Sequence, residues 1–481
     1  MAVAVMASRI INRENDRSRL KATRRAINAA TFKQYTLDQN YKSFFHFCAT
    51  LSSNSFPMKF LFLFFAGCMA VFLAEGQVPD SVYAPNIRTP QLYKAGNQLG
   101  FPILKLNSQD QLELHFDDLD GDVKNYYYTY QLCNADWTPA IVSEFDYIRG
   151  FSQVRIANYQ VSSVALTRYT HYQALLPDPN CMLIRSGNYL LKVFLDSDTS
   201  KLVFIRRMLV ADGKIIIGAQ ILQPLNPDIA HTHQRLVFKA NVGALNPNNA
   251  LDQIKVVILQ NHRWDNAIRD IKPTFYVNNN LDYNNSDDVV FPGGSEWRWV
   301  DLQSFRYQSD RVQNVIYGKT STEVFLRPDG DRSRQPYLFY KDYNGNYFIQ
   351  TTESINPYFQ TDYATVHFSF VPPDHSPWPD KDLYLLAKFT GGGLNDSTRM
   401  IYNADKGRYE LSFQMKQGFY TYAYVTVDRS DPGRKASFEF TEGNHIETEN
   451  GYTILMYYRA LGARADELAG IASVSSVNTF R

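Results

Sequence analysis

The sequence predicts an all-β protein made of tandem immunoglobulin-like or fibronectin-III-like β-sandwich domains. Aromatic residues make up 14% of the chain, with 32 Tyr and 32 Phe, and both residue types favour strands. Short segments of alternating polar and apolar residues recur between turn-forming residues. No sustained helical period follows residue 80, apart from a short turn near 464–469. The chain is also too long for a single core, which predicts several domains.

An export signal is expected at residues 58–76. It begins with Met58 and the basic Lys59, continues as a run of uncharged, mostly apolar residues, and closes on a small-x-small cleavage site that ends at Gly76. This is the layout of a cleaved secretory signal, and it is shorter than the roughly 20 apolar residues that span a bilayer. We therefore expect an exported chain that starts near Gln77.

Residues 1–57 precede that signal and need a separate interpretation. They are basic and carry no clear pattern. The alternatives are a nucleic-acid-binding arm, an organelle presequence, a disordered basic segment, or residues added by an over-extended gene start. We favour the last, because an export signal works at the N-terminus of a chain. The residues around Cys68 also faintly resemble a lipobox, which makes lipidation of this cysteine a less favoured alternative.

Turn signals and a proline-rich linker divide the exported chain. We expect a first β-sandwich at 77–212, a central β-rich domain at 213–375, a C-terminal early-set-like sandwich at 376–472 and a tail at 473–481. The pair Asn344-Gly345 predicts a hairpin turn. The proline-rich residues just before 380 cannot continue a central strand. A second hairpin is expected around Gly418.

An aromatic strand of the first domain ends at Asp136-Trp137. We expect Trp137 to be a core residue of this domain and Asp136 to fix the following turn. Cys133 and Cys181 are the cysteines of the exported chain. They are a candidate disulfide in an oxidising compartment, but two separate buried thiols fit the sequence equally well, because spacing alone cannot place two Cα atoms within bridging distance.

Aspartates around Gly121 invite comparison with a calcium loop, but their spacing does not support one. If Asp118 is position one, Val123 stands at position six, where a calcium loop has Gly. Thr129 then stands where a bidentate Glu is required. We interpret this segment as a solvated turn between strands.

No catalytic motif occurs with adequate spacing. The sequence has no nucleophile elbow, phosphate-binding loop or zinc-protease motif. His231 and His233 alternate on a predicted strand and could begin a zinc site, but no third ligand lies at a suggestive distance. A net charge of +1 gives no electrostatic case for a nucleic-acid partner. We therefore expect no enzyme, no metal or cofactor, and no small-molecule substrate.

An ordered set of short motifs resembles the type IX secretion system plug protein family over essentially the whole exported chain. The motif residues are Asp136, Trp137, His171, Tyr172, Gly187, Asn188, Arg263, Trp264, Glu296, Arg298, Asp342 and Gly345. The resemblance leaves open whether each is structural or faces a partner.

The resemblance implies a periplasmic protein of Bacteroidota that closes the periplasmic opening of the outer-membrane translocon barrel while no cargo passes. The barrel as partner comes from the resemblance alone, and no homo-oligomer is expected. The alternative is an exported carbohydrate-binding or adhesive protein, because the last domain is similar to sandwiches appended to glycan enzymes. Against this alternative, no Trp lies between Lys381 and Arg481 to stack on a sugar ring.

Overall fold

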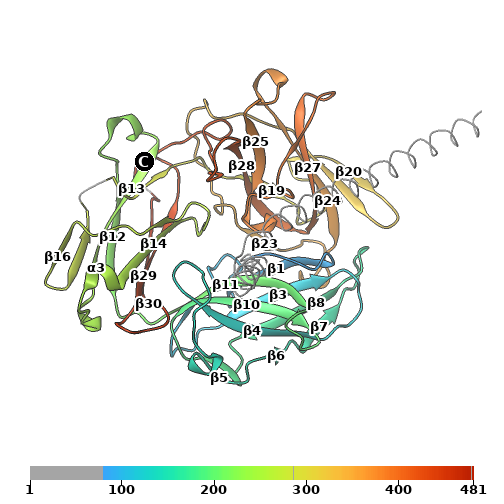
Figure 1. Cartoon of the computed structure of the whole chain (residues 1–481). Helices are drawn as coiled ribbons and strands as arrows, with labels where there is room; N and C mark the ends of the chain where they lie inside the picture. The colour runs from blue at the N-terminus through green and yellow to red at the C-terminus, as the bar shows by residue number, and fades with distance from the viewer. Residues whose placement is uncertain (1–79, 285–286, 478, 481) are drawn as a thin grey trace, which may run out of the picture. The chain divides into compact units, whose positions relative to one another are not determined.

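The computed structural model describes residues 80–284, 287–477 and 479–480, and strands dominate these residues (Figure 1). The expected segments 1–57 and 58–76, and the expected start at Gln77, lie outside the described residues. Among the residues that are described, no helix is both long enough and apolar enough to cross a membrane. The prediction of an all-β fold is confirmed.

The first sandwich has two sheets and a small ribbon. One sheet has the order β1 (Ile87–Lys94), β3 (Leu112–Asp118), β8 (Thr170–Leu176), β7 (Asn158–Val161). The other has the order β2 (Ile103–Lys105), β11 (Leu202–Ala211), β10 (Gly187–Leu195), β4 (Tyr126–Cys133), β6 (Val154–Arg155). The ribbon pairs β5 (Ile148–Gly150) with β9 (Cys181–Leu183). Aromatic rings from both sheets fill the core, for example Phe116 of β3, which meets Tyr126 of β4 edge to face with centroids 5.1 Å apart.

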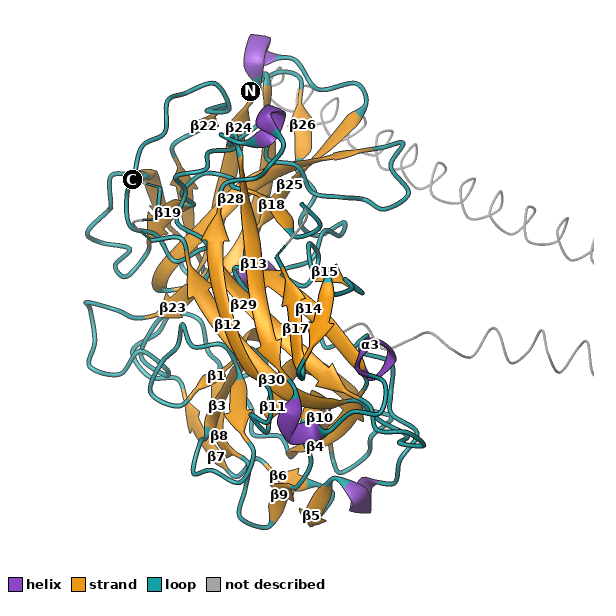
Figure 2. Cartoon of the chain, turned by 90° about the vertical axis from the view of Figure 1, so that its left-hand side faces the viewer, coloured by secondary structure: helices purple, strands orange, loops and turns teal. Residues whose placement is uncertain are grey.

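The second sandwich draws its strands from two distant parts of the chain. Its first sheet has the order β12 (Ile216–Leu222), β13 (His233–Asn241), β17 (Asn280–Tyr283), β16 (Phe275–Val277), with β18 (Val290–Pro292) also on β13. Its second sheet has the order β15 (Ile268–Arg269), β14 (Ile254–Gln260), β29 (Gly451–Tyr458), β30 (Glu467–Ser475). The short helix α3 (Ala250–Gln253) leads into β14. Figure 2 shows the long strands β12, β13, β14 and β29 of this sandwich together.

The third sandwich comprises the strands that lie between β18 and β29 in sequence. In one sheet β28 (Gly418–Asp428) pairs with β19 (Arg298–Asp301), β23 (Tyr347–Ile349) and β25 (Lys381–Leu386). The other has the order β20 (Val312–Tyr317), β21 (Thr322–Leu326), β24 (Tyr363–Val371), β27 (Arg408–Lys416), β26 (Ile401–Asn403), with β22 (Asp329–Gly330) also on β24. Side chains from both sheets form one core.

The third sandwich is therefore inserted into the second, and the expected boundary at 375/376 does not follow the sheets. Ile258 of β14 is paired with Ile454 of β29, so the end of the chain completes the sheet that β14 begins. Strand β30 runs to Ser475, which takes the start of the expected tail into that sheet. A strand can be predicted from its own residues. Its pairing partner cannot, because that partner lies far away in sequence and is chosen by packing.

Neither expected hairpin forms. The Asn344-Gly345 turn is present with positive φ at both residues, but β23 after it pairs with β28 rather than with the residues before the turn. Strands β27 and β28 flank Gln417 but belong to opposite sheets, so the chain crosses the core there. Gly418 suits this crossing, because a Cβ at its position would lie 2.4 Å from the Phe348 carbonyl oxygen.

Candidate functional site

Two junctions join the first sandwich to the rest of the chain, and both contain buried polar groups. We call the contact between the first and third sandwiches the polar junction. Its centre is Asp117, at the end of β3, with His171 of β8, Tyr363 of β24 and Lys416 of β27. All four side chains are buried.

The Asp117 carboxylate accepts hydrogen bonds from three donors of different kinds. His171 Nδ1 lies 2.7 Å from Oδ1, while Lys416 Nζ and the Tyr363 hydroxyl each lie 2.5 Å from Oδ2. Burial opposes ionisation, but Lys416 and the bond from His171 outweigh it and hold the pKa of Asp117 below its usual value. The junction therefore contains a carboxylate and an ammonium that neutralise each other away from water.

A chain of imidazoles extends from this carboxylate toward the solvent. His171 donates through Nδ1, so its Nε2 accepts from His115 Nδ1 at 3.1 Å. His115 Nε2 then faces Glu113 Oε2 at 3.3 Å. Burial lowers the pKa of both imidazoles, and lowers that of His115 to about 3. In this arrangement both histidines are neutral and the chain of hydrogen bonds has room for one more proton.

Further hydrogen bonds surround the polar junction. The backbone N–H groups of Leu166 and Thr167 donate to Asp362 at 2.8 and 3.0 Å. The hydroxyls of Tyr93 and Tyr358 lie 2.9 Å apart. Beside these groups lies a cavity of about 110 Å³ that His171 and Tyr358 both line, and it is large enough to hold water.

The apolar junction is the contact between the first and second sandwiches. Leu190, Ile205 and Leu209 of the first sandwich pack on Leu259 and Leu455 of the second. This cluster is built from outward-facing residues of two sheets, so two sandwiches share one additional core.

Trp137 lies in the apolar junction, which corrects its expected place in the core of the first sandwich. It is only 8% exposed, but its ring meets Trp264 edge to face at 4.9 Å, and the Arg207 guanidinium lies over both indoles. The inner face of the first sandwich is already filled by tyrosines, so the indole packs outward. Asp136 beside it is exposed and accepts bonds from Thr138, as expected of a turn residue.

Further family-motif residues fasten the edge of the apolar junction. Asn188 donates to the Asn134 carbonyl at 3.0 Å and accepts from the Tyr457 hydroxyl at 2.7 Å. Asp466 accepts from the Ala135 N–H at 3.0 Å and pairs with Arg459 at 2.6 Å. Two of these bonds, Asn188 with Tyr457 and Ala135 with Asp466, join residues more than 260 positions apart in sequence, which is why no local pattern predicts them.

The motif residues of the third sandwich form a separate buried brace. Arg298 pairs with Glu442 at 3.0 Å and with Asp329 at 2.9 Å. Glu442 and Asp329 are also paired with Arg332 and Arg311, respectively. A cleft of about 380 Å³ opens beside the brace, but the buried carboxylates and the Arg298 head are already paired. This arrangement supports a structural role.

Asp342 and Gly345 shape the turn that packs against this brace. Asp342 accepts from the backbone N–H groups of Trp297 and Asn344, and burial raises its pKa to about 7. Gly345 has φ +77°, and a Cβ there would lie 2.6 Å from the Trp297 ring. The glycine is therefore required both by its backbone conformation and by the close approach of the indole.

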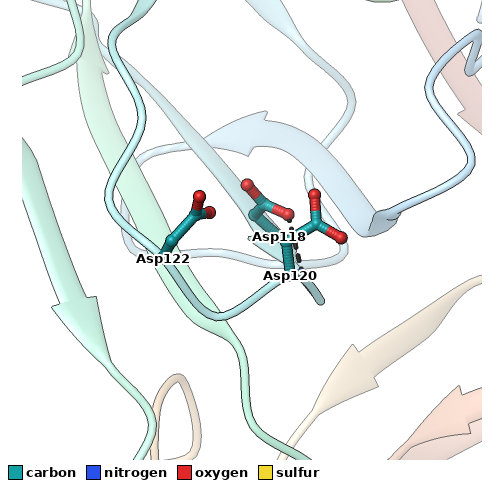
Figure 3. A group of neighbouring side chains, drawn as sticks. All are labelled: Asp118, Asp120 and Asp122. Atoms are coloured by element: carbon teal, nitrogen blue, oxygen red, sulfur yellow. Dashed lines mark hydrogen bonds between the residues drawn. The ribbon is translucent and has the colours of Figure 1, made fainter.

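The two cysteines remain unpaired, and three of the aspartates around Gly121 form an acidic cluster. Cys133 and Cys181 are free and buried in different clusters, so the candidate disulfide is not formed. Figure 3 shows Asp118, Asp120 and Asp122, the trio among the described residues whose carboxylates lie close enough to hold an ion.

A lysine already occupies the centre of that trio. Lys124 Nζ lies 2.9 Å from Asp118 and 3.3 Å from Asp122, and it also pairs with Asp120. The ammonium supplies the positive charge that an ion would bring, and the segment is a turn, as the sequence suggests. His231 and His233 are not members of any such group in the described ranges.

Comparison with known proteins matches this chain to a family model and to solved structures. A family model described as type 9 secretion system plug protein 1st domain matches residues 87–212, which span the first sandwich from β1 to β11. A crystal structure of a hypothetical protein from Parabacteroides merdae is similar to this chain with a TM-score of 0.78 and 30% identity, covering 83% of this chain and 100% of its own. No curated protein matches the sequence.

Proposed function

Because this chain belongs to the type 9 secretion system plug protein family, we propose that it is a non-catalytic periplasmic protein that closes the periplasmic opening of the system's outer-membrane translocon barrel between cargoes. The match of the first sandwich to the plug domain is the observation that carries this proposal. Export by a cleaved signal at 58–76 belongs to the same proposal.

The described residues form β-sandwiches with filled cores, which supports a role that depends on a rigid shape. A body that closes a wide pore must keep its form without a ligand, and β-sandwiches with filled cores do so. Two buried charged side chains, Asp117 and Arg298, are paired with partners from within this chain. Such pairs stabilise a structure rather than present groups to a substrate.

Binding to the barrel must be reversible, because cargo has to pass. Reversible complexes use interfaces of moderate area with a polar rim, unlike obligate ones. The family-motif side chains other than Asp136 are buried or half-buried within this chain. We therefore propose that they hold the plug together and that other, exposed residues face the barrel.

The test is outer-membrane permeability in deletion strains with and without the translocon gene. Loss of a plug should raise uptake of a large antibiotic only where the translocon is present, while cargo export continues. Complementation by the parent chain should restore the barrier, and so should His231→Gln and His233→Gln, which alter residues outside both junctions. Equal permeability in the two backgrounds would refute the proposal.

A second candidate, carbohydrate binding, gains one observation from the fold. Residues 381–481 contain no Trp, but β19 brings Trp299 into the same sheet as β28. Its ring lies nearly parallel to Phe419 at 5.9 Å, and Phe419 to Phe348 at 5.6 Å. Such a row can stack on sugar rings. Glycan-array binding by the whole chain that is lost in Trp299→Ala would favour this candidate over the plug.

A further inference from the structure

Among the described residues, the polar junction is the one contact between sandwiches that contains two buried histidines joined by a hydrogen bond. The titratable and charged groups around the pair come from five segments: Glu113, His115 and Asp117 of β3, Tyr169 and His171 at β8, Tyr93 of β1, Tyr358 and Tyr363 at β24, and Lys416 of β27. Both histidines lie on the first sandwich, and their buried cationic neighbour, Lys416, lies on the third.

We propose that the polar junction is an acid-sensitive latch that closes while the His115–His171 pair is short of protons and opens when the pair becomes fully protonated. The proposal concerns a property of this chain alone and does not depend on the proposed function. The apolar junction keeps the first sandwich attached to the second while the latch is open.

The hydrogen-bond geometry limits how many protons the closed junction can hold. With one added proton, His171 donates to both Asp117 and His115 Nδ1, and His115 donates through Nε2 to Glu113. Every polar atom of the chain from Asp117 to Glu113 then has a partner. A second proton places an N–H of His171 against an N–H of His115 across 3.1 Å, where neither can accept.

Electrostatic repulsion also disfavours a second proton on the histidine pair in the closed junction. Asp117 already neutralises Lys416 at 2.5 Å, so each proton on the pair adds a buried cation close to the ammonium. Glu113, three-quarters buried at the rim, is the remaining carboxylate on this chain of bonds. Separation of the sandwiches returns both imidazoles to water, where they take up protons near pH 6.5. The cavity beside His171 gives water a route to the pair.

Proton linkage gives the size of the effect. Opening takes up at least one proton relative to the closed junction, so the opening equilibrium should rise about tenfold for each pH unit below 6.5, and up to about a hundredfold if the closed junction holds none. The measured slope therefore counts the protons.

Hydrogen–deuterium exchange of the whole chain measures this opening. The N–H groups of Leu166 and Thr167 donate to Asp362 across the polar junction, whereas the Ala135 N–H donates to Asp466 across the apolar one. After correction for the intrinsic pH dependence of exchange, the first two should lose protection between pH 6.5 and 5, and Ala135 should not. An equal pH response at both junctions would overturn the proposal.

Three variants test whether the two histidines cause the pH-dependent opening. The double variant His115→Gln/His171→Gln should abolish the slope, while His231→Gln, an exposed histidine of the second sandwich, should leave it unchanged. Glu113→Gln alters only the rim and keeps the fold testable if the double variant does not fold. It removes the negative charge that accepts the His115 Nε2–H bond once the first proton is bound, so opening should begin at higher pH. A slope that persists in the double variant, or a Glu113→Gln profile like the parent's, would contradict the latch.

Discussion

The two junctions fasten the same sandwich in opposite ways. The apolar junction buries leucine, isoleucine and tryptophan side chains from two sheet faces, with polar bonds only at its edge. The polar junction instead buries a carboxylate, an ammonium and two imidazoles. Hydrophobic contact does not depend on pH and tolerates small displacements. The stability of a buried ion pair depends on the protonation state of both groups. It also requires both partners to be present, because an unpaired buried charge is costly.

The two contacts of the first sandwich should therefore differ in how they respond to pH. The first and second sandwiches share an apolar core, so they should behave as one body. The first and third sandwiches are held by groups that exchange protons, so their contact should respond to the solution. A comparison of variants at the two junctions can therefore break or sharpen this distinction.

The largest effect is expected from removing the central carboxylate of the polar junction. Asp117→Ala leaves Lys416 buried without a counter-charge and should lower the free energy of unfolding by about 3–5 kcal/mol, measured by denaturant titration at pH 7.5. Adding Lys416→Met removes the orphaned charge and should recover most of that loss. If Asp117→Ala melted like the parent, the ion pair would not hold the junction.

Trp137→Ala is the matching change at the apolar junction. A large-to-small change at a site 8% exposed should lower the free energy of unfolding by about 3 kcal/mol, with the same loss at pH 5.5 and pH 7.5. Tyr307→Ala, which truncates an aromatic side chain that is 82% exposed, is the control and should cost little. A loss that changed with pH would show that the two junctions are not independent.

The sequence predicted the strands well and their partners poorly. Alternation along residues such as 112–118 and 187–195 depends on each strand's own side chains, so the all-β class follows from local pattern. The pairing of Ile258 with Ile454 joins two strands that have the whole third sandwich between them in sequence, so neither strand's own pattern can name its partner. This is why the boundary at 375/376 and both hairpins were wrong.

The candidate residues divide in the same way. His171 and Asn188 were named from their motifs, but Lys416 and Asp117, which complete the polar junction, were not. Lys416 follows a run of alternating residues and reads as an ordinary strand end, since its burial arises only when the first sandwich covers it. Its sequence neighbours are Met415 and Gln417, so no local signal distinguishes Lys416 from a solvated lysine.

The smallest expected effect is at the rim, where it tests whether the strength of the polar junction is concentrated at its centre. Asp362→Ala removes two charge-assisted bonds that cross the junction, from Leu166 and Thr167. It should cost about 1–2 kcal/mol in unfolding free energy, because the carboxylate is half-buried and water replaces part of what is lost.

Asp198→Ala is the matched control: that carboxylate also accepts a backbone N–H, from Ser200, but within its own turn. Both variants remove an acid that caps backbone groups, yet only Asp362→Ala should raise exchange across the polar junction. If Asp362→Ala cost as much as Asp117→Ala, the rim would carry the contact, and the contrast between a buried charged centre and an apolar core would lose its physical basis.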